Sequence, residues 1–152
     1  HNVPFHIYLN KKPEKFDFTG LKIRVTPVYK DMVEAFGGTT ITTAPGEVYT
    51  ALERGVADGY GWPVTGIFDL GWEKVTKFRL EPGFYAVEGS KIGNVVKNKP
   101  MTLVKASDAD KARIREALTG VVLPNWVKRC GAKCGETYNE VIAPITGVRY
   151  RP

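Results

Sequence analysis

The sequence predicts an α/β fold, a mixed β-sheet with flanking helices. Between residues 21 and 59, short apolar segments alternate with stretches of helical periodicity in the order strand, helix, strand, helix, strand. This alternation is typical of a parallel or mixed sheet that has helices on its faces. The chain has 152 residues, of which 43% are hydrophobic and 25% are charged, so its length and composition suit a globular domain with a substantial core.

Composition and alternation predict the first two strands. Residues 4–9 are rich in β-branched and aromatic side chains. In residues 21–25, Leu, Ile and Val alternate with Lys22 and Arg24, which is the pattern of a half-buried strand. Because successive side chains on a strand point to opposite faces, Lys22 and Arg24 are expected to share the face opposite the apolar one.

Glycine and proline mark the ends of the elements that follow. Pro27 begins a predicted helix, and Gly37 ends it. Glu47 begins a second helix, where a carboxylate suits the helix dipole. The expected elements of this part are a helix at 27–36, a strand at 39–43, a helix at 47–54, a strand at 56–59 and a loop at 60–63.

The second half of the chain has weaker signals. Ile114, Leu118 and Val122 lie on the apolar side of an expected helix, which Pro124 is expected to interrupt. The expected elements are a short helix at 67–75, an extended segment at 78–85, a strand at 91–97, a helix from 107 to 123, a helical stretch at 125–141 and a strand at 148–150.

The positions of one arginine and of one aromatic segment predict where a ligand binds. In open α/β sheets, ligands bind outside the carboxyl ends of the strands. Arg24 and the segment Tyr60–Trp62 both lie near such ends in the expected arrangement. The sequence therefore predicts a small-anion pocket there.

The charge of the chain is positive but dispersed. The net charge is +6 and the pI is ≈ 9.3. The basic residues are scattered and do not alternate with aromatic residues as in an RNA-binding sheet, so no nucleic acid partner is expected. A net positive field favours anionic ligands instead. The sequence has no run of about 18 apolar residues, so no membrane span is expected.

Cys130 and Cys134 are the only two cysteines of the chain. Their spacing is a poor match to zinc motifs and to the C-x-x-C redox motif. A local disulfide or two free thiols remain, and an oxidising compartment favours the disulfide. In a straight helix, positions four apart lie at the long end of the Cα separation that a disulfide allows, so helical geometry could forbid the bond.

Two motifs lie in order along the chain without gaps. The first is Gly20-Leu21-Lys22-Ile23-Arg24-Val25, and the second has the form E-V-Y-x-A-L-x-x-G-x-x-D-G between Glu47 and Gly59, after the glycine pair at 37–38. Together they resemble the solute receptors of tripartite ATP-independent periplasmic (TRAP) transporters, of the DctP type. The resemblance extends more loosely through the whole chain.

The resemblance implies a two-lobed receptor of the type II kind, whose chain crosses between the lobes. By that pattern, residues 1–88 and 126–152 belong to the second lobe, and residues 89–125 belong to the first. Receptors of this family are longer, and residue 1 is a histidine within strand-like sequence. We therefore expect a fragment in which the first lobe is incomplete.

The resemblance also implies the ligand contacts. Arg24 is expected to pair with a ligand carboxylate, because a guanidinium donates two parallel hydrogen bonds that lysine cannot match. Trp62 lies where many relatives have an asparagine and is expected to form an aromatic wall. The other expected contacts are Tyr60, Phe84, Tyr85 and Asn94. The alternatives are a surface role for Arg24 and core packing for the aromatic residues.

The resemblance gives no reason to expect a metal ion or a cofactor. Relatives that bind keto acids have Glu-Trp at the positions of Gly61-Trp62, and that glutamate helps to hold a metal ion. Gly61 removes the carboxylate, so no metal site is expected. Relatives often have a second arginine upstream of the anchor. Residues 1–19 contain none, so that contact is missing or replaced by His6.

Loss of part of the first lobe would affect the helix that carries Ile114, Leu118 and Val122. Its apolar stripe would lose its packing partners and would be exposed unless another chain covered it. The sequence therefore predicts a homodimer or a swapped arrangement for this fragment.

These features together predict a receptor in the periplasm that binds a small organic acid and delivers it to membrane-embedded transporter subunits. The chain has no nucleophile elbow, phosphate-binding loop or H-E-x-x-H motif, so an enzyme is not expected. Two alternatives remain, an α/β enzyme that acts on an acidic metabolite and a truncated, non-binding fragment that dimerises. Trp62 favours a bulkier or more apolar acid than a short diacid.

Overall fold

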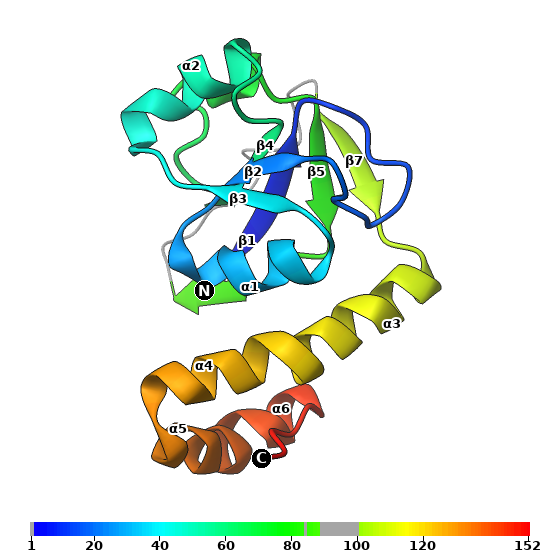
Figure 1. Ribbon diagram of the computed structural model, residues 1–152, viewed down its shortest axis with the longest axis vertical. Helices are drawn as coiled ribbons and strands as arrows, with labels where there is room; N and C mark the ends of the chain where they lie inside the picture. Colours follow the sequence, from blue (N-terminus) through cyan, green and yellow to red (C-terminus); the bar gives the residue numbers. More distant parts are fainter. Residues whose placement is uncertain (1, 84, 89–100) are drawn as a thin grey trace. The chain divides into compact units, whose positions relative to one another are not determined.

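A mixed β-sheet dominates the first of two units in the computed structural model (Figure 1). The structure describes residues 2–83, 85–88 and 101–152. The first unit comprises residues 1–107, and the second comprises residues 108–152. The described strands are β1 (Asn2–Leu9), β2 (Lys22–Arg24), β3 (Thr39–Ile41), β4 (Gly59–Pro63), β5 (Phe78–Glu81), β6 (Tyr85–Glu88) and β7 (Thr102–Lys105).

The strand order is β3-β2-β4-β1-β5-β7, and β6 pairs with β1 off this path. β1 runs antiparallel to β4, β5 and β6. β2 runs parallel to both β3 and β4, and β5 runs parallel to β7. The predicted mixed sheet with flanking helices is confirmed.

A β-α-β-α-β unit runs from β2 through α1 (Pro27–Ala35), β3 and α2 (Val48–Glu53) to β4. Pro27 lies in the first turn of α1, where its fixed φ suits a helix, and Gly37 follows the end of α1 with φ 81°. Before α2, the backbone N–H of Ala44 donates to Glu47 Oε2 over 3.2 Å. Glu47 thus supports a helix start, as predicted.

β4 lies at Gly59–Pro63, so the prediction of a strand at 56–59 followed by a loop was wrong. Gly59 and Gly61 lie on one face of this strand, so the sequence lacks the apolar side chains that would indicate a strand there. A Cβ atom on Gly61 would lie 2.6 Å from the ring of Tyr29, which α1 holds directly against the strand. Tyr60 and Trp62 alternate with the glycines and point to the other face. The close approach of α1 therefore requires glycine where an ordinary strand has a side chain.

α1 and α2 cover opposite faces of the sheet, one on either side of β2 and β3 in Figure 1. On the α1 face, the buried side chains include Ile23 of β2 and Tyr29 of α1. On the α2 face, one buried cluster joins the sheet to α2 and to the segment after β4. Its members are Tyr8, Val48, Ala51, Leu52, Ala57, Tyr60, Ile67 and Trp72.

Residues 67–75 form turns and a single 3-10 turn, Trp72–Lys74, so the predicted helix was wrong. Gly66 and Gly71 have φ angles of 85° and 69°, in the left-handed region. Two such residues so close together prevent a regular α-helix. The strand expected at 91–97 lies outside the described residues.

The second unit is helical. Its helices are α3 (Asp108–Ala117), α4 (Leu123–Cys130), α5 (Ala132–Thr137) and α6 (Ala143–Thr146). A π-helical turn at Leu118–Val122 joins α3 to α4, and another at Tyr138–Ile142 joins α5 to α6. Pro124 was expected to interrupt the helix, but the helical path continues through it. It lies in the first turn of α4, where the preceding π-helical turn has already changed the hydrogen-bond register.

Residues 148–150 do not form the predicted strand. The side chain of Asn139 pairs instead with the backbone of Tyr150. Asn139 Nδ2 donates to the carbonyl of Tyr150 over 3.0 Å, and the N–H of Tyr150 donates to Asn139 Oδ1 over 2.8 Å. A Cβ atom on Gly135 would lie 2.6 Å from the ring of Tyr150. The tail therefore packs on α5 without any strand pairing.

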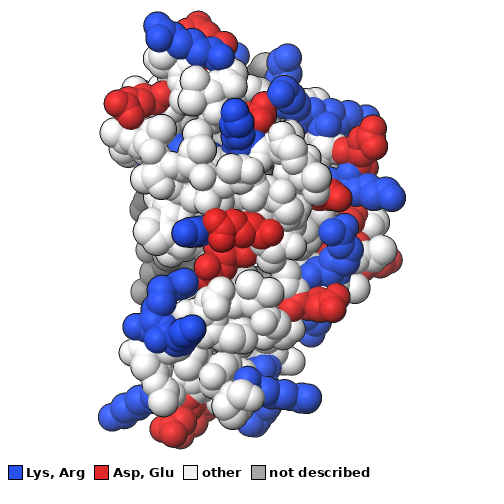
Figure 2. Space-filling model, in the orientation of Figure 1, with Lys and Arg blue, Asp and Glu red and all other residues white. Residues whose placement is uncertain are grey.

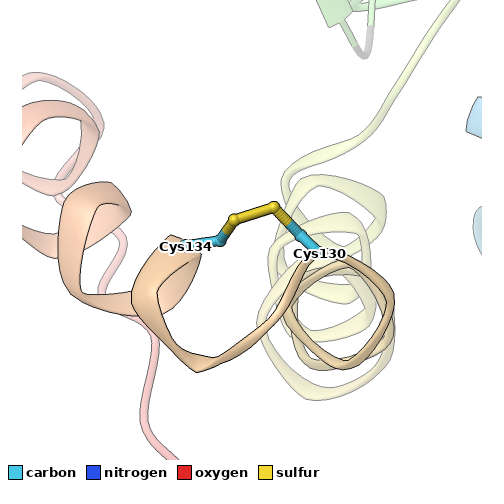
Figure 3. Close-up of a disulfide and its surroundings, with 2 residues drawn as sticks. All are labelled: Cys130 and Cys134. Carbon is cyan, nitrogen blue, oxygen red and sulfur yellow. A yellow bond between two sulfur atoms is a disulfide. The ribbon is translucent and has the colours of Figure 1, made fainter.

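Cys130 and Cys134 form a disulfide between α4 and α5 (Figure 3). Between them, Gly131 has φ 106° and ψ 157° and ends α4. The Cα atoms of the two cysteines are 6.0 Å apart. The favoured disulfide is confirmed, and the geometric objection does not apply, because the helix is interrupted between the two cysteines.

The apolar stripe of α3 and the following π-helical turn is not left open. Ile114 is 6% exposed and Val122 is 8% exposed, and Leu118 is partly buried. These three side chains are therefore covered within the described chain, which leaves the homodimer without the observation that motivated it, and the homodimer stays a prediction.

Charged side chains of both signs are interspersed over the face of the molecule in Figure 2. This distribution agrees with the scattered basic residues of the sequence and is unlike a continuous nucleic-acid-binding surface. Within the described part of the chain, we find no helix with the length and apolar character that crossing a membrane requires.

Candidate functional site

Arg24 is the last residue of β2 and lies on the face of the sheet that α2 covers. Its register partners are Ile41 of β3 and Tyr60 of β4, so these three residues share that face. The Arg24 side chain is buried, with 3% of its surface exposed. Both Nε and Nη2 donate to the carbonyl oxygen of Thr43, over 3.1 Å and 2.8 Å. The residue that follows β3 by two positions thus fixes the guanidinium.

One nitrogen of this guanidinium remains available. Nη1 of Arg24 is buried and has no hydrogen-bond partner among the residues that the structure describes. The same holds for the hydroxyl of Thr43. Burial lowers the pKa of Arg24, and the phenol of Tyr29 acts in the opposite direction. A buried donor without a hydrogen-bond partner lowers the stability of the fold, so a polar ligand or a water molecule bound to these two groups would be stabilising.

The ring of Trp62 lies beside Arg24. Cζ of Arg24 lies 5.5 Å from the centroid of the Trp62 ring, within the range of a cation–π interaction. The Trp62 ring also meets Trp72 edge to face, with 4.9 Å between centroids. Trp62 is only partly buried. The sequence placed Arg24 and Trp62 in one site, and the structure brings them together.

Tyr60 lies deeper than Trp62 and belongs to the core. Its side chain is fully buried and stacks on Tyr8, with 5.0 Å between ring centroids. The hydroxyl groups of Tyr60 and Thr76 are hydrogen-bonded over 2.8 Å, and the Thr76 hydroxyl donates to the carbonyl of Trp72. Burial raises the pKa of Tyr60 well above its ordinary value. Tyr60 thus packs with Trp62 and Trp72 in the buried cluster. A ligand contact for Tyr60 stays a prediction.

The other expected contacts fall in less described parts of the chain. Phe84 and Asn94 lie outside the described residues. Tyr85 is in β6, where its backbone is in register with Phe5 of β1. The ligand roles of Phe84, Tyr85 and Asn94 therefore stay predictions.

Gly61 lies on the other side of the sheet from Trp62. It faces the ring of Tyr29 at a distance that excludes any side chain. Among the described residues, no three or more His, Cys, Asp or Glu side chains lie together as metal ligands would. The space beside Gly61 is thus filled by Tyr29 of α1.

A polar cluster of four residues on the same face went unrecognised in the sequence. Tyr8 of β1 is in register with Arg79 of β5, and His6 lies two residues before Tyr8. Arg79 pairs with Glu81, and both His6 and Arg79 are buried. His6 Nδ1 lies 3.0 Å from the carbonyl oxygen of Leu80, so Nδ1 carries the hydrogen.

The environment of His6 favours its neutral form. Burial lowers the pKa of His6, although the carbonyl of Leu80 and the charge of Glu81 act against this shift. His6 was considered as a replacement for a missing arginine, but it is bonded within the cluster. Arg79 is the buried arginine that the sequence analysis missed. The alternation of Arg79 and Glu81 along a strand was the available signal.

Comparison with known proteins places the chain in a family. Residues 10–89 match the bacterial extracellular solute-binding proteins of family 7, the DctP family. An uncharacterised protein of Haemophilus influenzae is 31% identical over 144 residues, which are 89% of this chain and 42% of that protein.

Solved structures show the same fold. A TRAP periplasmic solute-binding protein from Desulfovibrio salexigens with bound orotic acid has a TM-score of 0.71 at 22% identity, over 89% of this chain and 57% of that one. Another from Bordetella bronchiseptica, with bound (R)- and (S)-mandelate, has a TM-score of 0.68 at 23% identity, over 86% and 55%. The chain thus spans little more than half the length of these structures and less than half of the Haemophilus relative.

Proposed function

The chain belongs to the DctP family of periplasmic solute-binding proteins, and from this membership we propose that it acts as the solute receptor of a TRAP transporter. Its ligand is a small organic acid, whose carboxylate binds to Arg24. The acid is delivered to membrane-embedded transporter subunits. The observation that carries this proposal is the buried guanidinium of Arg24, whose Nη1 has no partner among the described residues and which lies beside Trp62.

The chemistry of the site suits a carboxylate. The carbonyl of Thr43 holds Nε and Nη2, so Nη1 of Arg24 and the Thr43 hydroxyl are the buried polar groups of these two residues that remain without a partner among the described residues. A carboxylate accepts from both groups at once, and the low-polarity surroundings strengthen each charge-assisted bond. Trp62 then covers the apolar part of the ligand.

The proposed ligand has a ring or another bulky apolar group. Orotic acid and mandelate, bound to the two solved receptors above, each combine one carboxylate with a ring. The fold of those proteins resembles that of this chain, and the indole of Trp62 provides a matching flat surface. In this proposal residues 1–88 and 126–152 form the second lobe and residues 89–125 belong to the first, and closure of the lobes around the acid excludes water.

Calorimetry against a panel of aromatic and aliphatic carboxylates tests this proposal. We expect at least one aromatic acid to bind, and Arg24→Gln to weaken it by about 100-fold, the size of one charge-assisted bond pair. Arg24→Lys keeps the charge but loses the planar fork, so its affinity falls in between. Lys22→Gln, on the same strand but exposed, is the matched control and changes affinity by less than about twofold.

Two results would contradict the proposal. One is an Arg24→Gln variant, folded by circular dichroism, that binds the same acid as tightly as the parent. The other is the absence of binding for every carboxylate of the panel.

A further inference from the structure

A hollow in the second unit is lined by three arginines. Its volume is ≈ 540 Å³, and Arg115, Arg149 and Arg151 all contribute to its wall. The described residues that line it include no aspartate or glutamate. The hollow shares no residue with the Arg24 site, and every residue of its wall belongs to the second unit.

The three arginines are exposed and come from two segments of the second unit. Arg115 lies on α3, one turn before Thr119, whose hydroxyl donates to the carbonyl of Arg115 over 3.0 Å. Arg149 and Arg151 lie on the tail after α6, on either side of Tyr150. The two hydrogen bonds between the side chain of Asn139 and the backbone of Tyr150, and the contact with Gly135, hold Tyr150 on α5. Tyr150 does not line the hollow. The two flanking arginines therefore face the hollow while the residue between them anchors the tail.

The guanidinium groups of these arginines are not neutralised. In the part of the chain that the structure describes, no hydrogen bond or ion pair joins the side chain of Arg115, Arg149 or Arg151 to an acidic group. On the same helix as Arg115, Lys111 pairs with Asp108 over 2.7 Å. Three permanent positive charges around one hollow repel one another, and an anion between them removes that repulsion.

We propose that this hollow is a second anion site, which binds a small oxyanion with more than one negative charge. A hollow of this volume falls within the range of small-molecule sites. Planar guanidinium groups match the geometry of carboxylate and phosphate oxygens, and three of them satisfy a ligand with several such oxygens. The expected ligand is either a polycarboxylate or a phosphorylated compound. Two probes, one of each class, distinguish these two classes of ligand.

The test is a titration of the isotope-labelled chain with citrate and, separately, with pyrophosphate, followed by NMR. We expect the backbone amides of Thr119, Gly120 and Gly147 to shift with at least one probe. In the triple variant Arg115→Gln/Arg149→Gln/Arg151→Gln, the apparent Kd rises at least about tenfold.

A matched control removes the same charge elsewhere in the unit. Lys128→Gln/Arg129→Gln/Lys133→Gln changes α4 and α5 outside the hollow, and its Kd changes by less than about twofold. The amide spectra of both variants report whether the unit is folded. Shifts with citrate alone identify a polycarboxylate site, and shifts with pyrophosphate alone identify a phosphate site.

The proposal fails if neither probe shifts these amides at about 10 mM, a concentration at which even a weak site is occupied. It also fails if the control variant loses as much affinity as the triple arginine variant, because binding would then follow net charge alone. Shifts confined to the surroundings of Trp62 contradict it as well.

Discussion

The guanidinium of Arg24 lies over the indole of Trp62, with 5.5 Å between Cζ and the ring centroid. Trp62 in turn meets Trp72, a fully buried member of the core, at 4.9 Å. The indole of Trp62 thus contacts both the proposed ligand anchor and the core, while the carbonyl of Thr43 holds the guanidinium by hydrogen bonds. Changes to this ring are therefore expected to affect both the stability of the first unit and the surroundings of the anchor.

Trp62→Leu removes both contacts of that ring. We expect the free energy of unfolding to fall by about 2–3 kcal/mol, from lost aromatic burial and the lost cation–π interaction. Trp62→Phe keeps a ring in place and loses about 1 kcal/mol. Urea unfolding of the two variants measures the difference, and an equal loss for both would contradict the role of the ring.

Gly61→Ala places a methyl group against the ring of Tyr29, where a Cβ atom would lie 2.6 Å away. We expect a loss of about 1–3 kcal/mol of stability, because the sheet and α1 cannot separate without opening the core. Gly46→Ala is the matched control, since Gly46 has no atoms within 4 Å of a built Cβ and should change stability by less than about 0.5 kcal/mol.

A double mutant identifies the cause of the Gly61 effect. If the ring of Tyr29 is the obstacle, Gly61→Ala costs less in a Tyr29→Ala background than in the parent. The explanation is wrong if the cost of Gly61→Ala is the same in both backgrounds.

Asp58→Asn should alter the acid stability of the first unit. The buried Asp58 carboxylate accepts from the N–H of Lys22 over 3.0 Å and pairs with Lys11. Burial raises the pKa of Asp58, but the Lys11 and Lys22 hydrogen bonds outweigh it and hold the pKa below its ordinary value. The wild-type carboxylate therefore stabilises the fold above an unfolded-state pKa of about 3.9 and loses this contribution as pH falls through the lower folded pKa.

Urea unfolding between acid and neutral pH measures this effect. We expect the stability gap between the parent and Asp58→Asn to be full above about pH 5 and to narrow below about pH 4. Lys11→Met keeps the bond from Lys22 and should produce a smaller gap, because Lys11 is largely exposed. A gap that stays constant down to the lowest pH at which the parent is folded would rule out Asp58 as its source.

Removal of the disulfide should destabilise the second unit. Cys130 and Cys134 close a loop of only five residues, for which chain entropy gives about 2 kcal/mol. We expect Cys130→Ser/Cys134→Ser to lose about that amount, measured by denaturant unfolding with Trp126 as the probe. Reduction of the parent should give the same loss and should leave the double variant unchanged. Unaltered unfolding after full reduction would show that the bond does not stabilise this unit.

Periodicity predicted the first part of the sheet well. The β2-α1-β3-α2 segment was identified because apolar alternation and glycine or proline boundaries agree there. β4 was displaced because Gly59 and Gly61 give no apolar signal, and the need for glycine arises from Tyr29, a residue 32 positions earlier than Gly61. Such a contact exists only in three dimensions, so no local pattern reports it.

The candidate site was predictable in part. Arg24 was named from its motif and Trp62 from the family resemblance, and they lie together. The capture of Arg24 by the Thr43 carbonyl could not be foreseen, since a backbone acceptor leaves no trace in the sequence. Tyr60 was expected at the pocket, but its position in the register across from Tyr8 buries it. Arg79 was overlooked because its burial results from strand pairing far along the chain.

The position of β1 in the sheet has a consequence for the folding rate. β1 lies between β4 and β5, and in the described sheet it is the link between the β3-β2-β4 group and the β5-β7 pair. Its partners lie 50 or more residues away in sequence, as in the pairing of Leu9 with Gly59 and with Phe78. Closure of such large loops precedes the energetic gain from strand pairing. We therefore expect the sheet of the first unit to form slowly, because β1 must pair with strands that follow it at long sequence separation. The helices of the second unit contact near neighbours in sequence and are expected to form earlier.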